Sequence, residues 1–292
     1  MSNLKTDEDD DFITSASPET EPDEADFAFD AKEKKKKRSS IISRIILIIC
    51  ACVFVFAAVR LVSILLEYKK GNDIYDNIEG NVLDDTPVNI TIGEDNQDVT
   101  IPFVYNHQAL LDINPDGLGF LYVPSVDIRL PIAQTTDNDF YLTHSFDKSY
   151  NKAGWIFADY INKNLKNNEL DKNTIIYGHN RQNNSMFGTL SNVFKEEWLS
   201  NKENHYINFS TLNNNMVWEV FSTYTIEKEE YYIQSNFSSD EEYISFLNTI
   251  KNRSTYKYDV NISKEDKILT LSTCTNVGKG RTVLHAKLIY RK

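Results

Sequence analysis

The sequence predicts a mostly β protein: a closed, mostly antiparallel barrel of roughly eight strands with added helices, preceded by one transmembrane helix. Short apolar segments, alternating or β-branched and separated by turns, fill the chain from residue 110 onward. The 292 residues include 16 Tyr and 16 Phe, and aromatic side chains pack well on a pleated sheet. A long apolar run at 41–66 predicts the membrane helix.

The N-terminal segment, residues 1–40, is predicted to be a disordered tail. Residues 1–31 contain eleven Asp or Glu and few large apolar side chains. Such a segment cannot bury enough surface to offset the entropy of ordering. Residues 32–38 then reverse the charge, with six Lys or Arg shortly before the apolar run. We therefore expect an acidic and then basic tail.

The apolar run at 41–66 is predicted to be an uncleaved single-pass membrane anchor. From Ile45 to Leu66 the only charged residue is Arg60, and at ~1.5 Å per residue this stretch can cross a ~30 Å hydrocarbon core. Seven Lys or Arg at 32–44 put the N-terminus in the cytoplasm and the chain after about residue 67 outside. A cleaved signal peptide is the alternative, but the apolar region is too long and starts too late for one.

The outer part of the chain divides into a connector at 67–107, beginning with a helix that continues out of the membrane, and one domain at 108–292. Eight strands are expected in that domain, at 120–124, 126–133, 154–159, 174–177, 205–209, 216–226, 268–274 and 282–290. A helix is expected at 185–194, with Ser185 as its N-cap. Another is expected at 239–251, opening at Ser239 with an acidic first turn and with a core face made by Tyr243, Phe246, Leu247 and Ile250.

Composition excludes several classes of function. A net charge of −12 argues against nucleic-acid binding, which needs a basic face. The sequence has neither of the glycine-rich motifs that bind nucleotide phosphates. Its three cysteines, Cys50, Cys52 and Cys274, form neither a disulfide framework nor a zinc site. We therefore predict no metal and no cofactor.

The expected chemistry lies at the end of the predicted strand 268–274. Cys274 is the only cysteine outside the apolar run, and a short loop with two glycines separates it from Arg281. A buried structural thiol is the alternative, because free Cys is among the most buried residue types. His179 follows the predicted strand 174–177 at the start of a polar loop, where side chains are commonly presented. The other histidines are His107, His144, His205 and His285.

These residue types suit acyl transfer. A thiolate attacks carbonyl carbon readily, and a neighbouring cation favours the thiolate over the thiol. His179 would protonate the leaving amine and later deprotonate an incoming one. Arg281 cannot act as a base, but it can donate hydrogen bonds to substrate or to a developing oxyanion. The sequence therefore predicts Cys274 as nucleophile, His179 as acid and base, and Arg281 as stabilising cation.

Five motifs together resemble the sortase family, and within it class B. They are Tyr-Gly-His-Asn at 177–180, Ser-Met-Phe-Gly at 185–188, Thr-Leu-Ser-Thr-Cys at 270–274, Gly-Arg-x-Val at 280–283 and Trp-Ile-Phe-Ala-Asp-Tyr at 155–160. The resemblance covers about residues 108–291. It implies an eight-stranded β-barrel with added helices and assigns the three catalytic roles to the same residues, His179, Cys274 and Arg281.

The resemblance also implies a reaction. Sortases cleave a sorting motif near the C-terminus of secreted proteins after a Thr, hold the acyl group as a thioester, and transfer it to an amine of a cell-wall peptide or a pilin. The expected partners are therefore that motif, that amine and the membrane, with the catalytic domain outside the cell. Asn180, Ser185, Ser272 and Thr273 are candidate substrate contacts. An acidic tail of this length is not explained by the resemblance.

Two alternatives stay open at this stage. An L,D-transpeptidase also has a His before a Cys and a following Arg, but its Ser-x-Gly-Cys-x-Arg pattern is absent here. A papain-like hydrolase has the Cys before the His, which is the wrong order. From a different class, a membrane-tethered wall-binding protein without catalysis would have the same anchor and barrel.

Overall fold

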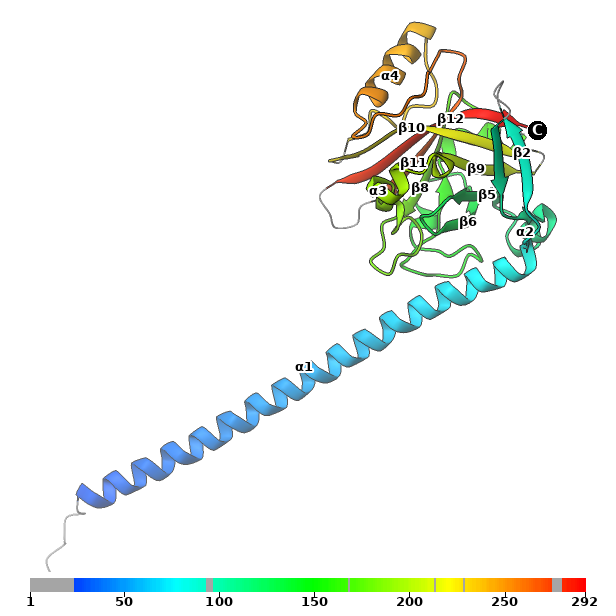
Figure 1. Ribbon diagram of the computed structural model, residues 1–292. Coiled ribbons are helices and arrows are strands. Elements are labelled where there is room, and N and C mark those ends of the chain that lie inside the picture. Colours follow the sequence, from blue (N-terminus) through cyan, green and yellow to red (C-terminus); the bar gives the residue numbers. More distant parts are fainter. Residues whose placement is uncertain (1–23, 93–96, 168, 213, 228, 275–279) are drawn as a thin grey trace, which may run out of the picture. The chain divides into compact units, whose positions relative to one another are not determined.

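The computed structural model describes residues 24–292 except 93–96, 168, 213, 228 and 275–279, with the side chains of Cys274, Gln97, residues 24–28 and residues 30–31 also left out (Figure 1). The chain divides into two compact units, Met1–Val62 and Ser63–Lys292. The predicted disorder of residues 1–23 falls outside the described residues.

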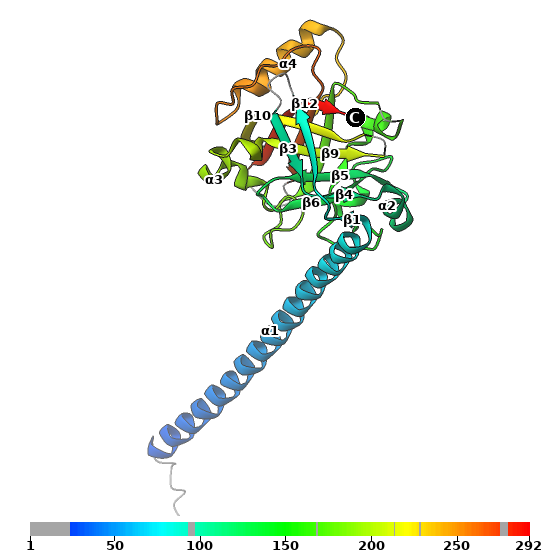
Figure 2. The ribbon, with the colours of Figure 1, turned by 45° about the vertical axis from the view of Figure 1, so that its right-hand side comes forward.

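The second unit is built on a closed barrel of eight strands, as the sequence predicts (Figures 1 and 2). Around the barrel the strand order is β10-β12-β11-β8-β7-β6-β5-β9. The strands are β5 (Gly117–Val123), β6 (Ile128–Ala133), β7 (Phe157–Ala158), β8 (Asn173–His179), β9 (Tyr206–Thr211), β10 (Met216–Ile226), β11 (Ile268–Cys274) and β12 (Arg281–Arg291). The pairs β6–β7 and β8–β11 are parallel, and the other neighbours are antiparallel.

Apolar side chains from the strands and covering segments form one large core. Every residue of β8 is buried, so both faces of this strand are covered and its sequence shows no alternation of apolar and polar residues. Trp155, Phe209 and Trp218 are fully buried within the same core. The barrel therefore has a packed interior, and its chemistry has to occur where the strands end.

Two predicted elements are shorter than expected. Only Phe157–Ala158 of the segment 154–159 is a strand, and Gly154 before it has a left-handed φ of +62°. Of the predicted helix 185–194, only the 3₁₀ helix η3 (Leu190–Phe194) forms. Asn184 and Met186 have φ values of +64° and +56°, which an α-helix cannot contain. The i, i+4 apolar spacing there reflects a compact loop, so the helix prediction was wrong.

The helix α4 (Asp240–Asn252) confirms the other helix prediction. The Ser239 hydroxyl accepts a hydrogen bond from the Glu242 amide at 3.2 Å, and the predicted apolar face is buried. The remaining short helices are α2 (His107–Ile113), η1 (Phe140–Leu142), η2 (Tyr160–Asn167), α3 (Glu196–Leu199) and η4 (Lys202–His205). Small strands precede the barrel: β1 (Leu83–Asp84) pairs with β4 (Val104–Tyr105), and β2 (Val88–Ile92) pairs with β3 (Gln97–Ile101).

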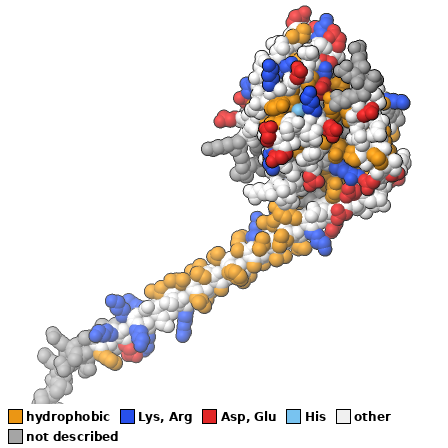
Figure 3. Space-filling view, viewed as in Figure 1, with side chains coloured by type: hydrophobic (Ala, Val, Ile, Leu, Met, Phe, Trp, Pro, Cys, Tyr) orange, Lys and Arg blue, Asp and Glu red, His pale blue; other side chains and the backbone are white. Residues whose placement is uncertain are grey.

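The helix α1 (Glu24–Val82) contains the predicted anchor. In the described part of the chain it is the one helix long and apolar enough to cross a membrane, and hydrophobic side chains cover much of its surface (Figure 3). The helix already begins at Glu24, whereas we expected residues 24–40 to be disordered. Lys, Glu and Arg are good helix formers, so a helix nucleated in the apolar run extends readily into the basic segment.

Candidate active site

Three neighbouring strands bring the predicted catalytic residues to one end of the barrel. In the parallel pair β8–β11, Cys274 lies opposite His179. The antiparallel pair β11–β12 runs in register from Ile268 opposite Lys287 to Ser272 opposite Val283. At the next residues the Thr282 amide donates to the Thr273 hydroxyl at 2.9 Å, and Arg281 is the first residue of β12. His179, Cys274 and Arg281 therefore lie at the ends of three adjacent strands, which are spaced about 4.8 Å apart.

The imidazole of His179 is almost completely enclosed, with 3% of the residue exposed. Its Nε2 lies 2.8 Å from the carbonyl oxygen of Leu142, and its Nδ1 is buried with no hydrogen-bond partner among the described residues. Burial lowers the pKa of His179, an effect that the Leu142 carbonyl partly opposes and the Arg181 charge reinforces. The neutral ring is therefore favoured, and it can accept a proton.

The guanidinium of Arg281 is tied to the barrel interior. Its Nη1 donates a hydrogen bond to the Tyr232 hydroxyl at 3.1 Å, and that hydroxyl lies 2.8 Å from the Ser272 Oγ. Tyr232 and Ser272 are both fully buried, whereas Arg281 is partly exposed. A charged donor held on a rigid interior contact at a strand end suits the stabilisation of negative charge on a substrate.

Known proteins resemble this chain over most of its length. The family model of the sortase domain matches residues 121–289 of this chain. Sortase B of Listeria monocytogenes is 31% identical over 256 residues, which cover 87% of this chain and 99% of the relative. The chain belongs to the sortase family.

Solved structures place this sortase in class B. The crystal structure of sortase B from Bacillus anthracis matches with a TM-score of 0.63 and 34% identity, covering 77% of this chain and 99% of that one. A Staphylococcus aureus sortase B–substrate complex matches with a TM-score of 0.58 and 32% identity, covering 63% and 84% of the two chains. Sortases are cysteine transpeptidases, so family membership favours this activity over the L,D-transpeptidase and the non-catalytic alternatives.

The candidate substrate contacts fall into two groups. Ser272 and Thr273 are buried, and their hydroxyls bond within the barrel: Ser272 with Tyr232, and Thr273 with the Thr282 amide at 2.9 Å. Asn180 is exposed, and Ser185 is partly buried. The Ser185 hydroxyl donates to the Asn183 side chain at 2.8 Å. Of the four, the loop residues Asn180 and Ser185 are therefore better placed than Ser272 and Thr273 to meet a ligand directly.

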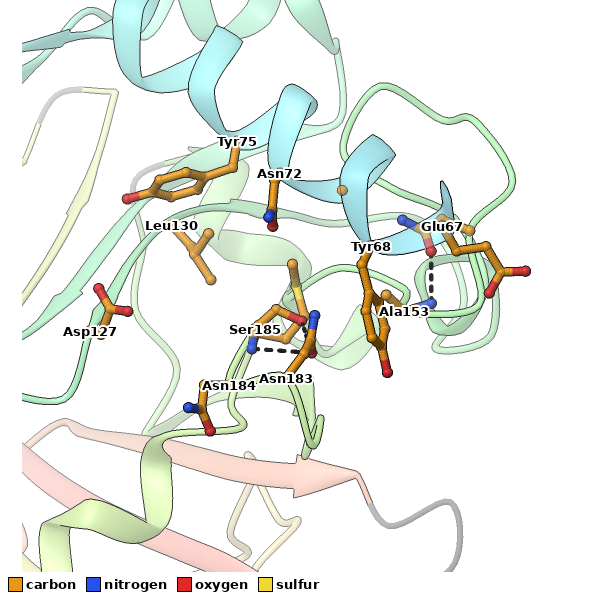
Figure 4. Close-up of a pocket in the computed structure, with 13 residues that line it drawn as sticks. Glu67, Tyr68, Asn72, Tyr75, Asp127, Leu130, Ala153, Asn183, Asn184 and Ser185 are labelled. Carbon is orange, nitrogen blue, oxygen red and sulfur yellow. Dashed lines mark hydrogen bonds between the residues drawn. The ribbon is translucent and has the colours of Figure 1, made fainter. Parts of the chain in front are cut away.

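A cavity of about 180 Å³ lies between the part of α1 after Glu67 and the loop that follows His179 (Figure 4). Tyr68 and Asn72 of α1 face Asn183 and Ser185 across it, and Tyr75 lies on the side of Leu130 and Asp127 (Figure 4). Among the described residues, neither His179 nor Arg281 lines the cavity, which borders the loop that follows His179.

Metal ligands are not grouped in the described residues: no set of three or more His, Cys, Asp or Glu side chains there is arranged to hold an ion. Cys50 and Cys52 lie in α1 with exposed side chains.

Sequence reasoning missed three residues that shape the site: Leu142, Gly154 and Tyr232. Leu142 contributes a carbonyl, which every residue type carries, so its identity held no signal. Tyr232 is one of 16 tyrosines and lies between β10 and α4, far along the chain from Arg281. Gly154 alone offered a hint, because a glycine directly before an apolar segment commonly marks a special backbone angle.

Proposed function

We propose that this sortase is a membrane-anchored transpeptidase that cleaves a C-terminal sorting motif of secreted proteins after Thr and transfers the acyl group to an amine. Cys274 is the nucleophile, His179 the acid and base, and Arg281 the oxyanion and substrate stabiliser. The observation that carries the proposal is the pairing of Cys274 with His179 across β8–β11, with Arg281 at the start of the neighbouring strand β12. The solved substrate complex of S. aureus sortase B supports a peptide substrate.

The first half of the reaction forms a thioester. His179 takes the proton of the Cys274 thiol, and the resulting thiolate attacks the carbonyl carbon of the scissile Thr. The carbonyl oxygen becomes an oxyanion that Arg281 stabilises. When the C–N bond breaks, the leaving amine takes a proton from His179. The acyl group then remains on sulfur, and His179 is left neutral.

The second half passes the acyl group on. An amine of a cell-wall peptide or of a pilin attacks the thioester while His179 accepts its proton. Collapse of the second tetrahedral intermediate restores the thiolate, and a new amide bond replaces the broken one. The buried, neutral character of His179 favours this step because a ring with a lowered pKa is unprotonated when the amine arrives.

Membrane attachment is part of the proposal. Residues 1–40 form the cytoplasmic tail, 41–66 the anchor, 67–107 the connector and 108–292 the extracellular catalytic domain. The length of α1, its apolar run and the basic residues that precede that run within the helix support this topology. Protease added to intact protoplasts should remove the barrel and spare an epitope placed on the tail. Loss of the tail epitope from intact protoplasts would mean that the orientation is the opposite of the one proposed.

The decisive experiment uses the full chain in detergent micelles with a library of quenched peptides varied around the scissile Thr, and an amine acceptor. We expect cleavage and a covalent acyl adduct on Cys274 by mass spectrometry, and Cys274→Ala should abolish both. The matched control replaces the other thiols, Cys50→Ala with Cys52→Ala, and should keep full activity. Cleavage that survives Cys274→Ala would refute the mechanism.

A further inference from the structure

The hydrogen bond between His179 and Leu142 fixes which ring nitrogen carries the proton. A carbonyl oxygen only accepts hydrogen bonds, so at 2.8 Å the Nε2 of His179 must be the donor. In the neutral ring the basic lone pair is then on Nδ1. That atom is buried and has no hydrogen-bond partner among the described residues. It is therefore the nitrogen left for proton exchange.

The turn that presents the Leu142 carbonyl is held from inside the protein. Leu142 ends η1, and the preceding Tyr141 is 1% exposed. The Tyr141 hydroxyl accepts a hydrogen bond from Asn114 Nδ2 at 2.7 Å and donates to Asp116 Oδ2 at 2.9 Å. The Tyr141 carbonyl accepts from the Trp155 amide at 2.8 Å. Because these three hydrogen bonds fix Tyr141, the turn can hold the carbonyl of the next residue, Leu142, in one direction.

Gly154 leaves the space in which this contact forms. A Cβ at this position would come within 2.8 Å of both His179 Cδ2 and the Leu142 oxygen, and within 2.5 Å of the Tyr141 oxygen. Its φ of +62° is also a backbone angle that favours glycine. Any side chain here would push the turn and the imidazole apart.

We propose that the Leu142 backbone carbonyl is the orienting group of the catalytic His179, so that Nδ1 is the atom that exchanges protons with Cys274 and the amines. Tyr141 and Gly154 are positioning residues that act through this carbonyl. In many hydrolases a carboxylate takes the orienting role and stabilises the imidazolium as well. A neutral carbonyl fixes the tautomer without that stabilisation, which agrees with the buried, neutral ring. The inference rests on the proposed role of His179.

The tautomer is measurable without any activity. The full chain, labelled with ¹⁵N in its histidine rings and held in micelles, is studied by long-range ¹H–¹⁵N correlation, with His179→Gln used to assign the resonance. We expect the neutral ring of His179 to carry its proton on Nε2. A proton on Nδ1 would overturn the inference.

The positioning roles are tested by two variants with matched controls. Gly154→Ala should lower kcat by about a hundredfold, since a misplacement of about 1 Å can cost that much. Gly80→Ala, where a Cβ meets nothing within 4 Å, should leave kcat unchanged. If Gly154→Ala does not fold, Tyr141→Phe still tests the positioning role. The Leu142 carbonyl raises the pKa of His179, so loosening the turn that carries this carbonyl should move the acid limb of the kcat/KM–pH profile to lower pH. Tyr150→Phe, at a residue 59% exposed, is its control.

The outcomes separate the inference from the proposed function. An Nε2–H tautomer in a chain whose transfer does not need Cys274 would leave the geometry correct and the proposed function wrong. An Nδ1–H tautomer in a chain whose transfer needs Cys274 and His179 would leave the proposed function correct and the inferred geometry wrong. Wild-type kcat and pH profile in a folded Gly154→Ala variant would remove the positioning role.

Discussion

His179 and Arg281 flank the same strand end, but the groups that hold them differ in kind. His179 is held by a backbone carbonyl from η1, a short surface turn. Arg281 is held by the Tyr232 hydroxyl, which bonds in turn to the Ser272 hydroxyl of the neighbouring strand. One side of the site thus depends on the path of the main chain, and the other depends on particular side chains in the barrel core.

This difference determines how each side tolerates change. Any residue at position 142 supplies a carbonyl, so the His179 side is sensitive to backbone shifts and to added volume at Gly154. The Arg281 side depends on particular hydroxyls, because Tyr232 and Ser272 are fully buried and water cannot replace a hydrogen bond lost between them. Substitutions on the two sides should therefore fail in different ways.

The largest effect on the Arg281 side is expected from Arg281→Lys. An ammonium cannot reproduce the planar guanidinium that reaches Tyr232 and an oxyanion together. Loss of one such donor costs about a hundredfold or more in kcat. Steady-state transfer assays and thermal unfolding should show that loss of rate with little change in Tm.

The matched control is Arg253→Lys, a partly exposed arginine that pairs with Glu229 at 3.1 Å. It should keep full activity. Near-normal transfer by Arg281→Lys would mean that only the positive charge matters, and the contrast between the two sides would then lose its basis.

A smaller effect is expected from Tyr232→Phe. The change removes the hydroxyl between Arg281 and Ser272, leaving a buried serine unsatisfied at a cost of about 1–3 kcal/mol in unfolding free energy. Transfer should fall about tenfold, equivalent to about 1.4 kcal/mol in the barrier. A double-mutant cycle with Arg281→Lys should be strongly non-additive.

The control for that cycle is Tyr231→Phe, whose hydroxyl donates to Tyr224 at 2.9 Å and not to Arg281. Its effect should simply add to that of Arg281→Lys. Additivity for Tyr232→Phe as well would show that Tyr232 does not act through Arg281.

The smallest effect on activity is expected at His285, which is fully buried in the core. Its effect is on stability. Burial lowers the pKa of His285 to about 3, and its ring bonds to Tyr224 and Thr270, each at 2.9 Å. The unfolded chain protonates this residue near pH 6.5 while the folded chain does not. The contribution of His285 to stability is therefore constant above about pH 6.5 and falls by about 1.4 kcal/mol per unit as the pH drops towards 3.

Urea unfolding of the full chain in micelles between pH 7 and pH 5 measures this slope. Because burial also lowers the pKa of His179, His205 and His107, the comparison is made against His285→Gln. That variant should lose the His285 share of the slope. An unchanged slope would mean that His285 takes up a proton in the folded barrel as easily as in the unfolded chain.

Much of the barrel could be predicted because its signals are local. The β10 segment was predicted with the same bounds, Met216–Ile226, and α4 was predicted from its Ser239 cap and apolar face. The segment at 185–194 was mispredicted because periodic apolar residues also occur in a loop that packs tightly around Gly188, where a Cβ would meet the Arg181 oxygen at 2.3 Å. Spacing alone does not report a left-handed φ.

The sequence by itself determined the fold class, the class B sortase resemblance and the identity of the candidate His179, Cys274 and Arg281. These follow from side-chain types in order along the chain. Only the tertiary structure decided the register that pairs Cys274 with His179, the contact of Arg281 with Tyr232, and the Leu142 carbonyl on His179. Those contacts join segments 37 or more residues apart, and one is made by a backbone atom that every residue shares. No local pattern of side chains encodes such a contact.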